Sequence, residues 1–362
     1  MADSLPTELI EIILHDVGFR DTLTLLACSL VTRAWTTPSQ IVLLHTITVS
    51  KPSTCRNLLQ YTAKGELLTR TRSLTIGDSC DLLESRSLDA LLAHLPNVKH
   101  VTFRSSPAMV PRRVAERLRS HGRLHAATFG SANSNRHLHL LATFSALGPN
   151  LRKLRFEGYG TGATEHRPST PPALATNPIH VDSIEFASGV RNDFRWLDIC
   201  KAVTIQNLRH LRVPIDSQRD HIELLKLLRQ APVLDNLVLV VNLPPFCHRE
   251  ISFEAAPSVC RAKRVEFHLN DMQDAFLLSL YITALDVTEE ICFKLSPGAA
   301  VLLGIVDHMV CDDKNVRKLK KYVVVYEGAG SLLRSREMMS AFEQQGVECI
   351  VEGCARSSVV VS

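Results

Sequence analysis

The pattern of apolar and polar residues repeats along this chain at a nearly constant spacing. In the clearest copy, Leu151 to Phe156, the first, fourth and sixth residues are apolar and those between them are charged. Successive copies begin 27, 27, 26, 27, 30, 27, 26, 28, 26 and 31 residues apart, and a period of this size indicates a solenoid of stacked repeats. The eleven copies begin at Leu44, Thr71, Val98, Leu124, Leu151, Val181, Leu208, Leu234, Ala262, Thr288 and Leu319.

Each copy of this six-residue template predicts a short buried strand. The eleven copies together have 33 positions at which the template expects an apolar residue. Only Thr71 and Thr288 depart from it, although just 45% of the whole chain is apolar. Helical candidates with Leu or Val at three- and four-residue steps lie between the strands, at 82–95, 110–120, 138–147, 221–230 and 275–285. Near the end, 322–327, 332–342 and 347–351 predict a last strand, helix and strand. A parallel neighbour needs a crossover connection, so we expect parallel strands inside and helices outside.

The first part of the chain follows a different pattern. Leu9, Ile12, Ile13 and Val17 fall on one face of a helix, whose N-cap would be residue 3 or 4 and whose first turn suits a proline at position 6. After a loop at 18–21, a second apolar stripe at 23–31 continues to residue 35. A proline follows at position 38, and the chain enters the first repeat at residue 44. We therefore predict a helical module at 1–43 and a repeat array at 44–354.

Three segments of this module together resemble an F-box. They are Leu5-Pro6-Thr7-Glu8-Leu9, the pair Ile12-Ile13, and the stretch from Leu26 to Trp35. An F-box reads LPxEL, then an Ile/Leu pair, then a leucine-rich helix closing on V-C-R-x-W, and the match covers residues 3 to about 48. Thr32 stands where Cys is usual, and Val17-Gly18-Phe19-Arg20 replaces the common Leu-Pro turn.

The F-box resemblance implies a partner. Modules of this family dock on the Skp-type adaptor of a Skp/cullin/F-box ubiquitin ligase. Carried over by position, the residues that form or support the adaptor-binding face are Leu5, Pro6, Leu9, Ile12, Leu30, Val31 and Trp35. Amphipathic stripes alone would fit a second reading, in which the helices only cap the solenoid.

The strand copies resemble the L-x-x-L-x-L part of the leucine-rich-repeat consensus. The next consensus element, an Asn or Cys eight residues after the first position, occurs only at Asn242 and Asn270, so we expect an irregular solenoid. A stretch at 158–178 with prolines at 168, 171, 172 and 178 predicts an inserted loop. The predicted fold class is α/β: a small N-terminal helical F-box, an irregular leucine-rich-repeat solenoid of about eleven repeats, and a frayed tail at 355–362.

Composition narrows the class of protein. The net charge of +4 over 362 residues gives little reason to expect a nucleic-acid partner. The ten cysteines form no CxxC pair, which favours reduced thiols in a cytoplasmic or nuclear protein. The N-terminus lacks the regions of a secretory signal, and the apolar runs are too short to span a bilayer, so we expect no membrane partner.

Motifs for catalysis are incomplete. Gly77-Asp78-Ser79 resembles the start of a GDSL esterase, but no histidine in the chain has an aspartate three residues before it to complete a D-x-x-H pair. His121/His125 and His137/His139 lack a second cluster of ligands at metal-binding spacing. We expect a protein that is not an enzyme, with no cofactor and no metal.

The third and fifth residues of each template should face the open, concave side of the array, because strand side chains alternate. Neighbouring strands lie about 4.8 Å apart, so Lys153, Arg155, His210 and Arg212 should flank Glu185 in one polar patch. This patch is either a solubilising surface or a partner-binding one, for which an acidic protein segment is the simplest ligand. Two functions therefore stand: the substrate receptor of a ubiquitin ligase, with an unknown protein target, or a repeat scaffold with no ligase role.

Overall fold

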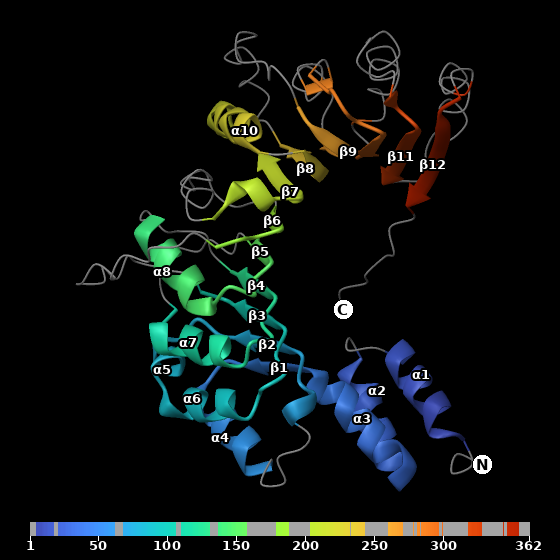
Figure 1. Cartoon of the computed structure of the whole chain (residues 1–362). Helices are drawn as coiled ribbons and strands as arrows, with labels where there is room; N and C mark the ends of the chain where they lie inside the picture. The colour runs from blue at the N-terminus through green and yellow to red at the C-terminus, as the bar shows by residue number, and fades with distance from the viewer. Residues whose placement is uncertain are drawn as a thin grey trace. The chain divides into compact units, whose positions relative to one another are not determined.

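The chain forms two compact units, Met1–Ile179 (unit 1) and His180–Ser362 (unit 2), shown in Figure 1. The structure, a computed structural model, describes residues 5–17, 21–61, 68–105, 110–130, 137–157, 179–187, 203–231, 233–242, 260–270, 278, 281–282, 284–296, 299, 318–327, 343 and 346–354. The proposed helix caps at residues 3 and 4, the inserted loop at 158–178, the helix at 332–342 and the tail at 355–362 lie outside these ranges. Most of the helix at 275–285 lies outside them too.

Unit 1 begins with three helices, α1 (Thr7–Val17), α2 (Thr22–Val31) and α3 (Arg33–His45). Ile10, Leu14 and Leu25 form their small buried core. The carboxylate of Asp21 accepts a hydrogen bond from the Thr24 backbone N–H at 2.9 Å, which caps the start of α2.

Helix α3 extends further than the apolar pattern suggested. It continues through Pro38 to His45, and the first strand follows at once at Thr46. A proline inside a helix loses one backbone hydrogen bond. Here Pro38 is buried, and Val42 and Leu43 pack against the module core from the same helix, so tertiary contacts offset that loss.

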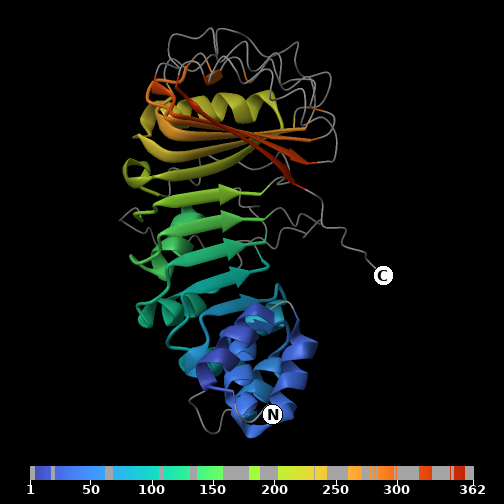
Figure 2. The same cartoon turned by 90° about the vertical axis from the view of Figure 1, so that its right-hand side faces the viewer.

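The rest of unit 1 alternates parallel strands with helices. The strands are β1 (Thr46–Val49), β2 (Ser73–Ile76), β3 (His100–Phe103), β4 (Ala126–Phe129) and β5 (Lys153–Phe156), paired in chain order (Figure 2). The helices between them lie along one face of the sheet (Figure 1). They are α4 (Pro52–Tyr61), α5 (Cys80–Leu83), α6 (Arg86–Ala93), α7 (Arg112–Ser120) and α8 (His137–Leu147), and a short 3-10 helix, η2 (Leu68–Arg70), precedes β2 in the chain.

The helix predicted at 82–95 is two helices. The hydroxyl of Ser85 accepts a hydrogen bond from the Ser87 backbone N–H at 3.1 Å and so starts α6 after α5 has ended. This local bond competes with a continuous helix, as serine hydroxyls commonly do.

Unit 2 repeats the parallel arrangement. Its strands are β6 (Ser183–Phe186), β7 (His210–Ile215), β8 (Leu234–Val241), β9 (Ala262–Leu269), β10 (Glu290–Leu295), β11 (Lys321–Glu327) and β12 (Glu348–Cys354). Each pairs in parallel with the next. The described residues also include η4 (Ile205–Asn207) and α10 (Gln218–Gln230), which covers the predicted helix at 221–230.

The strand registers agree with the repeat read from the sequence. Ser73 pairs with His100 and Glu290 with Lys321, which reproduces the template steps of 27 and 31 residues. The two threonines at apolar positions are buried, and each hydroxyl donates to the backbone carbonyl one repeat earlier: Thr71 to Leu44 and Thr288 to Ala262, both at 2.8 Å. These bonds satisfy the buried hydroxyls, so a threonine fits there.

The core follows the template. Phe103, Phe129 and Phe156 occupy its sixth position on three successive strands, are fully buried, and stack with ring centroids 5.5 and 5.7 Å apart. The predicted α/β architecture of parallel strands and crossover helices is therefore confirmed. Within the described ranges, no helix is long and apolar enough to cross a membrane.

Candidate functional site

The helical module carries an exposed apolar surface on α1 and α2. Leu30 is 85% exposed and Ile12 64% exposed, and Leu5, Leu9 and Val31 are also open to solvent. In the described part of the chain, eight of the ten exposed large hydrophobic side chains lie between residues 5 and 31. Exposed apolar side chains concentrated in one short segment are typical of interaction sites. We call these eight residues the apolar face: Leu5, Leu9, Ile12, Ile13, Leu23, Leu26, Leu30 and Val31.

The seven residues assigned to adaptor binding divide into two groups. Leu5, Leu9, Ile12, Leu30 and Val31 belong to the apolar face, and the adjacent proline at position 6 is exposed as well. Trp35 is half-buried and packs against the module core, so it is not part of the apolar face.

Three members of the apolar face were not among the predicted residues. Ile13, Leu23 and Leu26 are exposed on the same two helices. The sequence could have identified them, because each belongs to an apolar stripe. A core of only three residues, Ile10, Leu14 and Leu25, cannot bury both stripes completely.

The predicted polar patch involves both units. Lys153 and Arg155 are exposed on β5 in unit 1, and Arg155 pairs with Glu157 at 3.2 Å. In unit 2, Glu185 on β6 stands in register with Arg212 on β7, two residues after His210. The predicted alternation holds on β5, but on β6 Ser183 is buried although it was expected to face the open side, and Glu185 and Arg212 are half-buried. A single patch made from all five residues stays a prediction.

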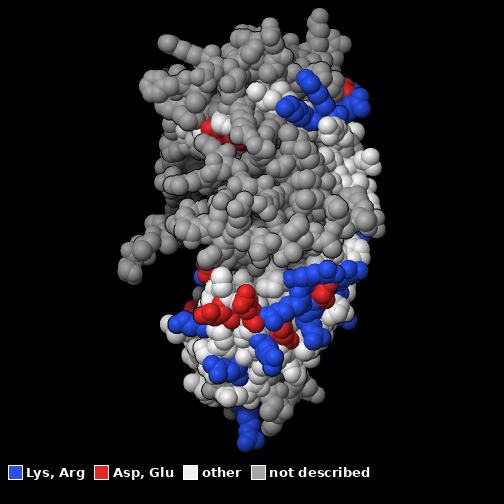
Figure 3. Space-filling model, turned by 90° about the vertical axis from the view of Figure 1, so that its left-hand side faces the viewer, with Lys and Arg blue, Asp and Glu red and all other residues white. Residues whose placement is uncertain are grey.

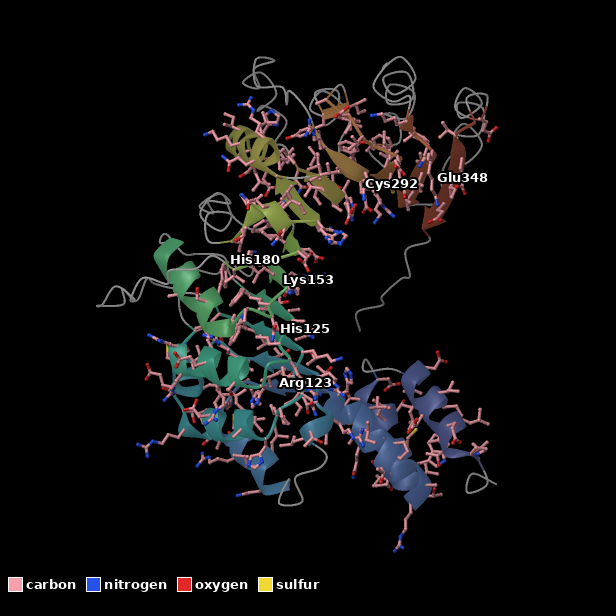
Figure 4. All side chains as sticks on the ribbon, viewed as in Figure 1. Arg123, His125, Lys153, His180, Cys292 and Glu348 are labelled. Carbon is pink, nitrogen blue, oxygen red and sulfur yellow. The ribbon has the colours of Figure 1, made fainter. Side chains whose placement is uncertain are left out.

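A further surface lies at the second residue of each template, just before the strand. In unit 1 these residues are all basic, and we call them the basic row: His45, Arg72, Lys99, His125 and Arg152. The backbone N–H of each member after the first donates to the carbonyl of the member before it, at 2.8 or 2.9 Å. The members therefore stand one strand spacing apart, about 4.8 Å. Figure 4 labels His125 and two nearby cations, Arg123 and Lys153.

The electrostatics of His100 report the density of positive charge beside this row. His100 is the third template residue of β3 and is exposed. Partial burial of the ring lowers its pKa from the ordinary 6.5, and His125, Lys153 and Lys99 lower the pKa further through their charges. A like charge disfavours protonation, so His125, Lys153 and Lys99 act on this imidazole in the same direction as its burial.

The same template position in unit 2 alternates in sign. We call these residues the alternating row: Asp182, Arg209, Asp235, Lys263, Glu289 and Lys320. Lys263 binds Asp235 at 2.8 Å and Lys320 binds Glu289 at 2.9 Å. Hydrogen bonds from these lysines lower the pKa of both carboxyls, and the bond to Asp235 raises the pKa of Lys263.

A buried ion cluster lies on β9 and β10 of unit 2. Glu266 is only 6% exposed and accepts hydrogen bonds from His268 at 2.5 Å and Lys294 at 2.7 Å. Burial raises the pKa of this carboxyl, but the bonds and charges of His268 and Lys294 outweigh burial and hold the pKa at about 2. The Glu266 side chain is therefore an ionised carboxylate that is bound by His268 and Lys294 of the same chain.

Three buried cysteines are held as thiols. Burial raises the pKa of Cys55 and of Cys292 to about 11 and that of Cys260 to about 12. A thiol of such high pKa is a poor nucleophile near neutral pH. Within the described ranges, no three His, Cys, Asp or Glu side chains are grouped so that they could hold a metal ion.

The two rows could have been read from the sequence, because the second template position is basic in all five early repeats and alternates afterwards. The predicted concave-face residues came only from the third and fifth positions, which face the open side, and so did not include the two rows.

Comparisons with protein-family models and with curated proteins find no match to this chain.

Proposed function

We propose that this protein is the substrate-receptor subunit of a Skp/cullin/F-box-type ubiquitin ligase. Its helical module docks on the Skp-type adaptor, and its repeat array holds a protein target while other subunits transfer ubiquitin. The chain then needs no catalytic residue of its own. The runner-up is a repeat scaffold without a ligase role, in which α1 and α2 only cap the array.

The apolar face is the observation that carries the proposal. A helical cap that ends a solenoid presents polar side chains to water. Here Ile12 and Leu30 are more than half exposed although both helices already have a packed core behind them. Exposed apolar area of this kind is stabilised by a partner that covers it, and five of its eight positions are those at which the resemblance places adaptor contacts.

Direct binding of the adaptor tests the proposal. The purified full chain is titrated with a Skp-type adaptor by isothermal calorimetry, as wild type and as the double variant Ile12→Glu, Leu30→Glu. Both side chains point to solvent, so the fold should survive. Two charges in the centre of an apolar interface should weaken binding roughly a hundredfold or more.

A matched control uses another exposed isoleucine. Ile222 on α10 is exposed but lies outside the module, so Ile222→Glu should bind the adaptor as tightly as wild type does. Trp35 is unsuitable for this purpose, because its replacement would also disturb the module core. If the wild-type chain does not bind a competent adaptor, the receptor proposal is wrong and the scaffold reading replaces it.

A further inference from the structure

The carboxylates of the repeats in unit 1 lie away from the amino ends of the strands. Between residues 46 and 157, all six described carboxylates follow a strand or lie on the helices after it: Asp78, Asp81, Glu84, Asp89, Glu116 and Glu157. The basic row lies at the amino ends. Parallel strands bring all amino ends to one edge of the sheet, so the basic side chains of successive repeats add to one another.

Basic residues outside the row strengthen the same edge. Arg70 and Arg123 stand just before the first template residue of their repeats, and both are exposed. On the helix side, by contrast, Lys and Arg are interspersed with Asp and Glu in the described part of unit 1 (Figure 3). The strand-entry edge is therefore the region where positive charge is least balanced within the repeats of unit 1.

The contacts at the centre of this edge are with neutral groups. Arg72 Nη1 donates to the Asn97 carbonyl at 3.5 Å, and Arg123 Nη1 donates to the side-chain oxygen of the same asparagine. His125 Nδ1 lies 3.5 Å from the Asn150 carbonyl. Amides orient these side chains without cancelling their charge. Burial is the first cause of the lowered pKa of His100, and the charges of His125, Lys153 and Lys99 lower it further.

A row of hydroxyls runs parallel to the basic row, three residues or about 10 Å further along the strands. The fifth template residue is threonine in four successive repeats, Thr48, Thr75, Thr102 and Thr128, which pair in register across β1 to β4. We call these residues the threonine row. Threonine hydroxyls can donate to carboxylates and to peptide carbonyls, and none of the four is fully buried.

We propose that the basic row and the threonine row bind an acidic, Asp- and Glu-rich polypeptide segment lying extended across β1 to β5. The five members of the basic row span about 19 Å, which about six residues of extended chain cover. This inference names the chemistry of the target and rests on the proposed function for the target's role, but the binding itself requires no adaptor.

A nucleic acid fits this surface less well. Single-stranded nucleic acids are held by basic grooves together with aromatic side chains on which the bases stack. The third and fifth template residues of β1 to β4 are Thr, Ser, Ala and His, and the phenylalanines of these strands are buried in the core. Small hydroxyl side chains suit a peptide backbone better than a base.

Fluorescence anisotropy tests the inference with the full chain and a fluorescein-labelled peptide of about ten residues, alternating Glu and Ser. The double variant Lys99→Gln, Arg123→Gln removes two cations at the centre of the edge. We expect it to bind the peptide about tenfold more weakly than wild type, and wild-type binding to weaken as salt is added.

The control removes the same charges from equivalent positions in unit 2. Arg261 and Lys263 flank a first template residue as Arg123 and His125 do, and Arg261→Gln, Lys263→Gln changes the net charge of the chain equally. This control should bind the peptide as wild type does. Thermal melts verify that both variants are folded.

Three outcomes would overturn the inference. They are equal affinity of wild type and the Lys99, Arg123 variant, equal loss in the unit 2 control, and no binding of the acidic peptide. A single-stranded oligonucleotide that binds more tightly than the peptide, and through Lys99 and Arg123, would also overturn it in favour of nucleic acid. Adaptor titration of the same variants separates the two proposals, because the apolar face does not include either residue.

Discussion

The basic row and the alternating row occupy the same template position on the same kind of strand, yet they differ in how their charge is neutralised. In unit 2 the chain supplies its own counter-charges, as the pairs between Lys263 and Asp235 and between Lys320 and Glu289 show. In unit 1 Lys99 and His125 follow Arg72 without a carboxylate between them in the row. The parallel strands therefore form whether the second template residue is positively or negatively charged.

This difference separates two roles of a surface charge. A row that alternates in sign stabilises the strands that carry it, though exposed pairs contribute little. A row of one sign is slightly destabilising on its own and gains from an acidic partner. An acidic segment bound as proposed above would relieve the repulsion among Arg72, Lys99 and His125.

The largest expected effect concerns the buried fourth residue of the template, which the two units have in common. Leu154 on β5 and Leu237 on β8 are both fourth template residues and fully buried. Changing either to Asp buries an unpaired charge and should lower the free energy of unfolding by at least about 3 kcal/mol. Urea unfolding measures it. Arg155→Asp, an exposed neighbour, should remain folded; comparable losses from Leu154→Asp and Arg155→Asp would refute the assignment of buried and exposed positions.

A smaller effect distinguishes the fifth template position of the two units. The pKa of Glu266 is about 2 in the folded chain and about 4.5 in the unfolded chain. This pKa difference corresponds to a contribution of about 3 kcal/mol to the free energy of unfolding. Because the folded pKa is the lower one, this stability is fully present above pH 4.5 and is lost as the pH falls toward 2. Glu266→Gln should be destabilised by up to that amount at neutral pH.

The pH profile provides the check. Between pH 4.5 and 2 the difference in unfolding free energy between wild type and Glu266→Gln should shrink. Thr102→Val, at the same template position of β3, should leave the profile as in wild type. A gap that stays constant across this pH range would show that Glu266 is not stabilised as a carboxylate.

The smallest effect compares the rows directly. Lys263→Gln removes a cation from between two carboxylates, so it should lower the melting temperature slightly at low salt. Lys99→Gln relieves repulsion and should leave the melting temperature unchanged or raise it. Added salt should reduce both differences. The same sign of change in both variants would contradict the comparison.

Most of the strand architecture could be predicted from the sequence. The spacing from Val98 to Leu124, and from Ala262 to Thr288, equals the observed register because a solenoid allows one residue of each repeat to stand beside the same residue of the next. The continuation of α3 through Pro38 could not be predicted, because packing against the module overrides local preference.

Hydrogen bonds between repeats were also beyond the pattern. Asn97 donates to the Thr69 carbonyl at 2.6 Å and Asn150 to the Gly122 carbonyl at 2.8 Å, from the position just before the template. The leucine-rich-repeat consensus directs attention to a later asparagine instead. Similarly, hydropathy marks Thr71 as an exception, whereas its hydroxyl is satisfied by the Leu44 carbonyl.

The two proposals together require that one chain bind an adaptor through its helices and an acidic target through its strands at the same time. The most direct test is an anisotropy titration of the labelled acidic peptide with the full chain, in the presence and absence of saturating Skp-type adaptor. We predict the same peptide affinity in both titrations, and a larger final anisotropy with the adaptor because all three components join one complex. Displacement of the peptide by the adaptor, or an adaptor that never joins the complex, would contradict the claim.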